Sequence, residues 1–514
     1  MKKQMYGIIG LSAAVVVLGG GLIALNVADK SVNEDKNPVV EQTTENTGRG
    51  FIIVDDSSAP YIPDAGVTAK GKVKSVKVTN GDIVLDAIIS KEASEGSYSE
   101  YTLRGYEDLS VDSLLVSTLF NNAFGLASES IIEENCTDFD KFGLADTAVS
   151  VEVTFESGNT KKLLVGDSSP VTSNVYVRLD GSDTIYDVIS SKMANYKEPV
   201  SHFIDKTVVA KLDETANIKI NSLEIVRKDL KDEFLIEFNP DKEKDDYRGS
   251  SSEYLMKKPV ETFIEVEAGD AAMKGLFGLT ANDISVLHCT DADIAKAGLD
   301  DAFCKASVKA SNGDAHTLLL SETFKDEDGT ELCYGMIEGG KVIYTFVPAS
   351  VTWLTLTPQS IASQNTIVSF VWNISNLEVN CGDTTEVFTI EPKESGADRT
   401  KAKKENMNVT RNGKSFDAER YRQFYAFLTA APAEELAYEE PVPSGKPVVT
   451  LKYSDAVSGD SFTYEFYDHS AMKSLIVING KSMFTCSKSY VNTLADNIGR
   501  IKSGMAFETK WSGQ

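Results

Sequence analysis

The chain has 514 residues, of which 42% are hydrophobic and 25% are charged. One hydrophobic core does not grow to this size, so length and composition predict a folded protein of about two to four domains. The net charge of −26 repels phosphate backbones and anionic lipid headgroups. The sequence therefore argues against a nucleic-acid-binding protein and against broad contact with an anionic membrane surface.

The N-terminal segment predicts a membrane anchor. Residues 7–28 carry no charge, and these 22 residues can cross a hydrocarbon layer about 30 Å thick as a helix. Lys2 and Lys3 precede them, so the positive-inside rule places residues 1–6 in the cytoplasm and the C-terminal domains outside the cell. A cleaved signal peptide is the alternative, but its apolar core is usually about 7–15 residues long. We therefore expect a retained, single-pass anchor in the cell membrane.

A polar stretch follows the predicted anchor. Residues 29–66 lack hydrophobic periodicity, which is typical of a flexible linker between a membrane and folded domains. The short apolar stretch at residues 51–54 interrupts this linker, and we expect it to dock on the first folded domain.

Three stretches farther along the chain begin in the same way. Residues 73–78, 220–225 and 374–379 alternate apolar and polar residues, which is the period-2 pattern of a half-buried strand. A helical pattern follows each of them. Its apolar residues are Val111, Leu114, Leu115, Leu119 and Phe120 in the first copy, Met273, Leu276 and Phe277 before Gly278 in the second, and Tyr421, Phe424, Tyr425 and Leu428 behind the candidate N-cap Asp417 in the third.

A recurring hairpin completes the pattern. The stretches YVRLDGSDTIYDV from Tyr176 and YGMIEGGKVIYTF from Tyr334 share one design around Gly181 and Gly339. Counting five residues each way from these glycines places Tyr176 opposite Tyr186 and Tyr334 opposite Tyr344, and such aromatic pairs stabilise a hairpin by about 0.2–1 kcal/mol. The third copy, around Gly480, has Leu475 and Thr485 instead, so we interpret the tyrosines as packing residues. A ligand-stacking role is the alternative.

These copies predict three related units, at residues 67–205, 206–370 and 371–514, of which the third is degenerate. Consecutive hairpins indicate antiparallel sheets, so the predicted fold is α+β. It consists of an N-terminal transmembrane helix followed by three strand-rich repeat units, each an antiparallel sheet with one main helix.

The first unit resembles the domain of unknown function 4340 family. The resemblance rests on FGLADTAVSVEVTFESGNTKKLLVGD from Phe142, on VYVRLDGSDTIYDV from Val175 and on FIDKTVV from Phe203. The second unit departs from the pattern, because Ser321 and Glu322 replace a Gly-Asp pair and Tyr254 stands where Trp is common. The resemblance implies a membrane-anchored extracytoplasmic protein, often encoded near ABC-type transporters with gliding-motility-type subunits. It brings no catalytic residue.

The histidines and cysteines form no recognisable catalytic or metal motif. The histidines are His202, His288, His316 and His469, and none has zinc-site spacing. The six cysteines, at positions 136, 289, 304, 333, 381 and 486, contain no Cys-x-x-Cys. Cys304 and Cys333 belong to strands of one unit, and a disulfide between them is permitted outside the membrane. Buried free thiols are the interpretation that we favour.

Two acidic stretches raise the question of calcium binding, at residues 240–246 and 325–331. The second has Phe324 where an EF-hand loop needs its first ligand, so we interpret it as a solvated hairpin turn. The sequence therefore predicts no catalytic residue, no cofactor and no metal ligand.

We expect a non-catalytic accessory or interaction subunit of an ABC-type transporter or envelope complex, with a protein partner and no nucleic acid. The alternative is an extracytoplasmic module that binds or senses a ligand. A cell-wall hydrolase is a third hypothesis, which only the expected location favours.

Overall fold

The structure is a computed structural model, and it describes residues 51–59, 70–94, 98–145, 148–246 and 252–512. The predicted anchor at residues 7–28 lies outside the described residues, as does most of the predicted linker. Among the helices that are described, none combines the length and the apolar character that crossing a membrane requires.

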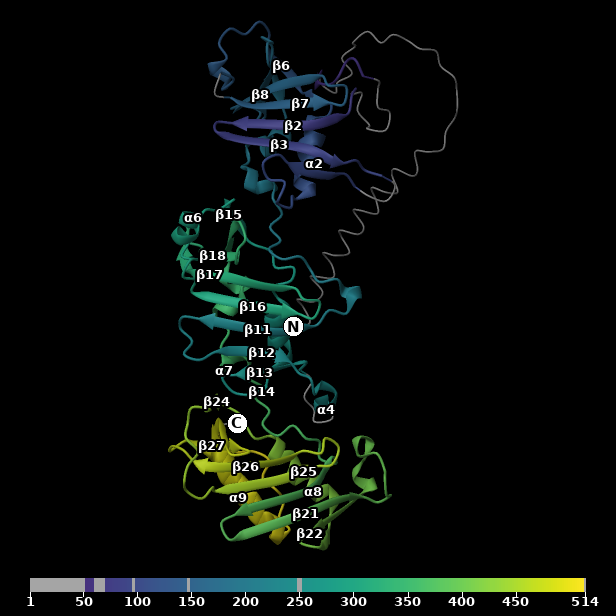
Figure 1. Ribbon diagram of the computed structural model, residues 1–514, viewed down its shortest axis with the longest axis vertical. Helices are drawn as coiled ribbons and strands as arrows, with labels where there is room; N and C mark the ends of the chain where they lie inside the picture. Colours follow the sequence, from purple (N-terminus) through teal and green to yellow (C-terminus); the bar gives the residue numbers. More distant parts are fainter. Residues whose placement is uncertain (1–50, 60–69, 95–97, 146–147, 247–251, 513–514) are drawn as a thin grey trace, which may run out of the picture. The chain divides into compact units, whose positions relative to one another are not determined.

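Antiparallel strand pairs dominate the described residues (Figure 1). This confirms the predicted class in its coarse form, a strand-rich α+β protein with few helices. The strands form four sheets rather than three, because β1 and β5 pair into a small sheet of their own. By their contacts the described residues fall into two compact units, of which 51–59, 70–72, 122–145, 148 and 155–193 make up the first.

The first large sheet has eight strands in the order β4-β3-β2-β7-β8-β9-β10-β6. Their bounds are β2 Val73–Asn80, β3 Ile83–Lys91, β4 Glu100–Leu103, β6 Ser130–Glu133, β7 Val149–Phe155, β8 Thr160–Ser168, β9 Val175–Leu179 and β10 Ile185–Val188. Helices α2 (Ser113–Ala123) and α3 (Ser190–Met193) belong to the same part of the chain.

The second large sheet has nine strands in the order β14-β13-β12-β11-β16-β17-β18-β19-β15. Their bounds are β11 Ile220–Arg227, β12 Phe234–Phe238, β13 Tyr254–Lys258, β14 Thr262–Phe263, β15 Asp283–Leu287, β16 Cys304–Ala310, β17 Ala315–Lys325, β18 Glu331–Ile337 and β19 Val342–Phe346. The helices of this stretch are α4 Lys242–Asp246, α5 Val266–Lys274, α6 Asp291–Lys296 and α7 Pro358–Ile361.

The third large sheet has nine strands in the order β23-β22-β21-β20-β25-β26-β27-β28-β24. Their bounds are β20 Ile374–Cys381, β21 Thr384–Pro392, β22 Met407–Arg411, β23 Lys414–Phe416, β24 Glu435–Leu436, β25 Val449–Asp455, β26 Ser461–Asp468, β27 Lys473–Ile478 and β28 Lys481–Ser487. Helices α8 (Ala418–Thr429) and α9 (Lys488–Ser503) follow β23 and β28. The strand orders of the second and third large sheets correspond position by position, and the eight strands of the first correspond to all of these positions except that of β14 and β23.

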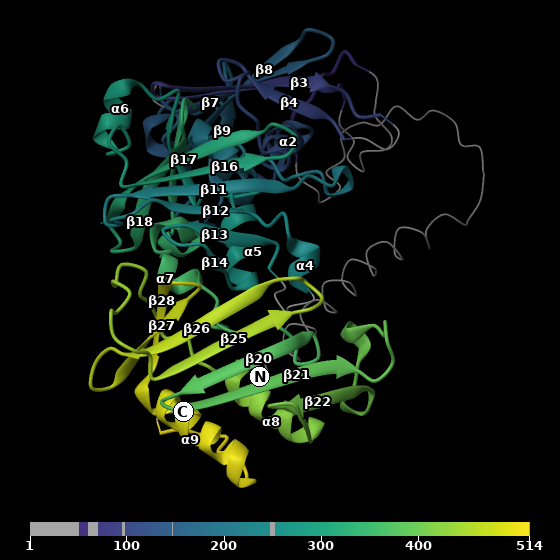
Figure 2. The ribbon, with the colours of Figure 1, turned by 60° about the horizontal axis from the view of Figure 1, so that its bottom comes forward.

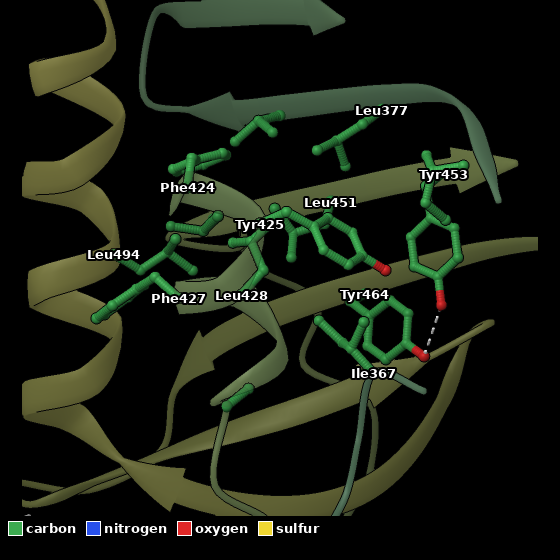
Figure 3. Packing of buried hydrophobic residues seen from close by; sticks show 14 of the residues in the cluster. Ile367, Leu377, Phe424, Tyr425, Phe427, Leu428, Leu451, Tyr453, Tyr464 and Leu494 are labelled. Carbon is green, nitrogen blue, oxygen red and sulfur yellow. Dashed lines mark hydrogen bonds between the residues drawn. The ribbon is translucent and has the colours of Figure 1, made fainter. Parts of the chain in front are cut away.

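The core of the third sheet lies between its strands and two helices. Helices α8 and α9 pack on the same face of the sheet (Figure 2). Tyr425 and Tyr464 are buried there, and their hydroxyls donate to the carbonyls of Ser369 and Thr366, at 2.7 and 2.9 Å. Figure 3 shows this packing, with Tyr453 and Tyr464 in contact. The segment just before β20 therefore satisfies phenols that burial would otherwise leave without a partner.

The predicted helices form, but only the third matches its predicted face in full. All four of its apolar residues are buried, and the Asp417 carboxylate caps α8 by accepting from the Arg420 amide at 2.8 Å. In α2, Leu119 and Phe120 are buried as predicted, whereas Leu114 is exposed and the buried Val116 was not predicted. Helix α9 was not predicted, so the third unit has two main helices rather than one.

The predicted tyrosine pairs were wrong by one residue. Tyr186 lies opposite Val177, and Tyr344 lies opposite Gly335, so the two tyrosines of each hairpin point to opposite faces. The error arises because both hairpins turn between two residues rather than on the glycine. Tyr176 packs edge-on against Phe142, at 5.0 Å between ring centroids, which agrees with a packing role.

The apolar stretch before the first large sheet docks as expected. It forms strand β1 (Phe51–Val54), which pairs with β5 (Leu126–Ser128). The buried Asp56 follows, and its carboxylate accepts from the Ser157 hydroxyl at 2.5 Å and from the Asn159 amide at 2.9 Å. These hydrogen bonds hold the pKa of Asp56 far below its ordinary value.

A buried ion pair fixes the end of α9. Glu386 on β21 is fully buried, and its carboxylate accepts from the Arg411 guanidinium at 2.6 Å and from the Asn412 amide at 2.9 Å. Arg411 also donates to the carbonyl of Ile501 in the last turn of α9. The pair therefore joins two strands and a helix at one point.

We predict that Glu386→Ala lowers the free energy of unfolding by about 3 kcal/mol, because it leaves the Arg411 charge without its partner. Urea unfolding of the full-length protein measures this effect. The matched control is Glu378→Ala on β20, whose partly exposed carboxylate lies 3.5 Å from Lys452, and its expected cost is below about 1 kcal/mol. Equal costs for the two variants would contradict the prediction.

Candidate binding groove on the second sheet

A groove of about 620 Å³ opens beside the second large sheet. Most of its lining comes from four segments, which are residues 208–213, the turn after α5, the stretch from the β16–β17 turn into β17, and the β18–β19 hairpin; Leu109 and Ile218 complete it. The first two segments run side by side, because the Val208 amide donates to Leu279 and the Gly278 amide donates to Val209, both at 2.8 Å. Segments that are distant in sequence therefore form one wall.

Gly278 permits this close approach. Its φ of +82° is a conformation that side chains disfavour, and a Cβ there would lie 2.6 Å from Cγ of Lys211. The prediction that the helix ends at this glycine was wrong, because α5 ends at Lys274, and Gly278 lies in the turn that follows.

Apolar side chains form the floor of the groove. They are half-buried and pack against the core of the second sheet, and they are Val208, Leu212, Ile218, Phe277, Ile337 and Tyr344. A floor of this kind loses contact with water when an apolar group covers it, which favours binding.

Two of the groove's aromatic rings lie against each other. His316 on β17 packs edge-to-face on Phe277, with ring centroids 5.9 Å apart and planes at 76°. Tyr344 lies on β19, where burial and the nearby charge of Asp205 raise the pKa of its phenol. The Tyr344 phenol therefore stays protonated near neutral pH and presents a hydrogen-bond donor.

Charged groups of both signs form the rim. Asp213 accepts from the Thr215 hydroxyl at 2.6 Å and from its amide at 2.8 Å, which holds the pKa of this carboxyl low. The Asn312 amide donates to Asp314 at 2.7 Å, and Lys341 pairs with Asp108 at 3.3 Å. Each of these rim groups thus has a partner within the chain.

The four histidines do not come together. His316 alone lines the groove, whereas His202 packs edge-on against Phe203. His288 lies 2.9 Å from the Asp108 carboxylate and stacks on Tyr106, and His469 is exposed in a turn. Within the described ranges, no three His, Cys, Asp or Glu side chains gather as metal ligands would.

All six cysteines are free thiols. Cys304 and Cys333 lie in one core cluster, as expected of strands in one unit, but no disulfide joins them. Burial raises the pKa of each of these two thiols to about 12. Burial likewise raises the pKa of the Cys486 thiol, in the third sheet, to about 12.

The two acidic stretches use their carboxylates for local structure. Asp326 accepts from the amides of Asp328 and Thr330, which closes the β17–β18 turn that the sequence predicted. Asp245 is buried in α4 and accepts from the Asn239 amide at 2.7 Å. Both stretches thus serve as turn and helix elements.

Sequence reasoning missed the groove. From sequence, His316 was predicted only to lack zinc-site spacing, and Tyr344 was interpreted as a packing residue. No local motif marks the groove, because its residues come from separate segments between Leu109 and Tyr344.

Comparison with known proteins finds one matching family model. Residues 102–302 match the family model described as "Domain of unknown function (DUF4340)". The match begins inside β4 and ends two residues before β16, so it includes Val208 and Phe277 of the groove. No curated protein and no solved structure matches the chain.

We predict that an alkylating reagent at pH 8 labels Cys289 and Cys381 of the native protein before Cys304, Cys333 and Cys486. The latter three are buried and have raised pKa values, so they form little thiolate at this pH. Mass spectrometry of labelled peptides measures the order. All six cysteines should react after denaturation without a reductant, and a Cys304–Cys333 pair that reacts only after reduction would contradict the structure.

Proposed function

We propose that this chain, whose residues 102–302 belong to the domain of unknown function 4340 family, is a membrane-anchored extracytoplasmic interaction subunit. In this proposal it serves an ABC-type transporter or envelope complex and carries out no catalysis itself. Its second sheet would bind a segment of the partner protein in the groove between Val208 and Tyr344.

The groove is the observation that carries this proposal. It combines an apolar floor, the ring pair of Phe277 and His316, and a rim whose charges are already held in place. Interfaces between proteins take most of their energy from one or a few large apolar side chains that fill such hollows. A rigid rim reduces the entropy that binding costs.

The negative net charge of the chain favours a cationic occupant of the groove. A net charge of −26 attracts cationic partners and speeds their approach. We therefore propose an occupant with one large apolar or aromatic side chain between basic residues, in a loop or extended segment of the partner. Its cations would face the rim carboxylates Asp213 and Asp314.

The strand orders support the finer proposal that the three large sheets are repeats of one plan. The second sheet differs from the third in carrying the groove. Phe462 follows the turn glycine Gly459 at the same interval as His316 follows Gly313, and its ring packs on Tyr453 and Tyr464. In the third sheet this place is thus occupied by packed aromatic side chains.

A ligand-binding or sensing module is the second candidate. The groove volume of about 620 Å³ favours it, because small-molecule sites usually measure about 300–1,000 Å³. Thermal stabilisation of the full-length protein by one class of compound would support this candidate.

The experiment is a crosslinked pull-down of full-length protein from membranes, followed by mass spectrometry. We expect transporter or envelope subunits at near-stoichiometric amounts with the native chain. Ile337→Glu should lower their recovery about tenfold, because it places a charge on the floor where the anchor side chain would lie.

The matched control is Ile478→Glu in the third sheet. Ile478 is half-buried and pairs with Tyr464 as Ile337 pairs with Leu318. Recovery should stay at the native level in this variant. Equal losses in both variants, or loss in neither, would argue against the groove as the docking site.

A further inference from the structure

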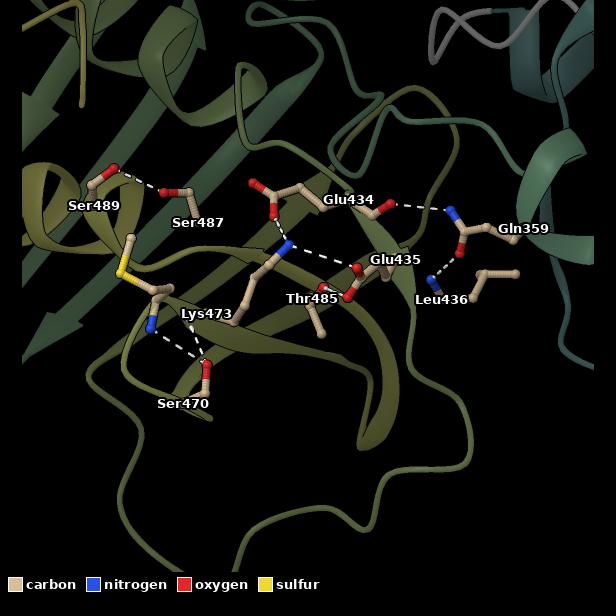
Figure 4. A network of polar contacts seen from close by, with 10 residues as sticks. Gln359, Glu434, Glu435, Leu436, Ser470, Lys473, Thr485, Ser487 and Ser489 are labelled. Carbon is tan, nitrogen blue, oxygen red and sulfur yellow. Dashed lines mark hydrogen bonds and ion pairs between the residues drawn. The ribbon is translucent and has the colours of Figure 1, made fainter. Parts of the chain in front are cut away.

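At one edge of the third sheet, a side chain forms hydrogen bonds with the backbone of the edge strand. Strand β24 pairs with β28 on one side, with Glu435 opposite Thr485 and Leu436 opposite Phe484. On the side of β24 away from β28, the Gln359 side chain forms two hydrogen bonds with the backbone of Glu434 and Leu436, as Figure 4 shows. Gln359 donates to the carbonyl of Glu434 at 3.0 Å, and its carbonyl oxygen accepts from the Leu436 amide at 2.5 Å.

A primary amide suits this role because it carries one acceptor and donors side by side, as a peptide group does. The carbonyl of Glu434 and the amide of Leu436 are what an edge strand offers to a neighbouring strand. The Gln359 side chain therefore forms the hydrogen bonds that a further strand would form.

Gln359 is presented from a fixed position. It belongs to α7, which begins with a capping box in which the Thr357 hydroxyl accepts from the Ser360 amide at 3.1 Å. Ile361 at the end of α7 is fully buried in the core of the second sheet. The short helix is thus held at both ends.

Further contacts hold the segment that contains β24. Lys473 pairs with the Glu434 carboxylate, and the Thr485 hydroxyl donates to Glu435 at 3.3 Å. Leu436 packs against the cores of both the second and the third sheet. Farther along, the Tyr438 hydroxyl donates to Asp232 at 2.8 Å.

The corresponding edge strands of the other large sheets are protected differently. Strand β6 has an extra residue, Ile132, in its pairing with β10, and β15 has an extra residue, Ser285, in its pairing with β19. Such bulges are a common way to keep an edge strand from pairing further. The pairing of β24 is regular over its two residues, and it is here that Gln359 lies.

We propose that Gln359 acts as the missing edge strand of the third sheet. Its amide group closes the β24 edge and, by doing so, latches residues 434–439 to the second sheet.

Hydrogen exchange of the full-length protein in detergent, read by mass spectrometry, tests this proposal. In Gln359→Ala the Leu436 amide should exchange about fivefold faster, which corresponds to the loss of one hydrogen bond at an accessible site. In Gln359→Glu it should also exchange faster, because the carboxylate has no donor for the Glu434 carbonyl and lies near two acidic side chains. The exchange of β25 to β27 should not change.

The control is Gln423→Ala on α8, where an exposed amide donates only to the Glu419 side chain, at 3.3 Å. It should leave exchange at residues 434–437 unchanged. Unchanged exchange in both Gln359 variants would overturn the proposal. Faster exchange spread evenly over the third sheet would overturn it as well, because it would indicate general destabilisation rather than a local cap.

Discussion

An antiparallel sheet has two faces and two edges, and the structure depends on how these are covered. The apolar face of the third sheet is covered by α8 and α9, and part of the second is covered by α5. Backbone groups at an edge strand can pair with a further strand unless something prevents it. Bulges interrupt the pairing of the edge strands β6 and β15, and the Gln359 amide forms hydrogen bonds with the backbone at β24. The second and third sheets thus depend on residues from outside their strands.

The groove arises where this covering is incomplete. In the third sheet Phe462 and its neighbouring tyrosines fill the place that follows the β25–β26 turn. In the second sheet His316 stands there, and the floor between Phe277, Ile337 and Tyr344 stays partly open. Two sheets with the same strand order therefore differ at this place. Aromatic side chains fill it in the third sheet, whereas in the second it stays open as a candidate binding surface.

Periodic patterns predicted the strands well because burial on one face imposes alternation directly. The strands that begin at Val73, Ile220 and Ile374 and the buried face of α8 follow from their sequences. The register of the tyrosine hairpins did not follow, because a shift of one residue in the turn moves Tyr186 from Tyr176 to Val177. The pattern of α9 was readable at Tyr490, Leu494 and Ile498, but it was overlooked.

The groove and the Gln359 cap could not be predicted in this way. Both depend on segments that meet only in the folded chain, as with Val208 beside Leu279 and Gln359 beside Leu436. The free state of Cys304 and Cys333 was favoured but not decided from sequence, because only the folded sheet shows that β17 separates the strands that carry them.

We propose that the groove of the second sheet binds a partner protein. The most direct measurement replaces Lys341 on the rim with a photoreactive amino acid and irradiates intact membranes that contain the full-length chain. We expect one main protein adduct, which disappears when Ile337→Glu is added. Lys481, an exposed lysine beside the corresponding turn of the third sheet, gives the background. Adducts from Lys341 no more abundant than those from Lys481 would contradict the claim.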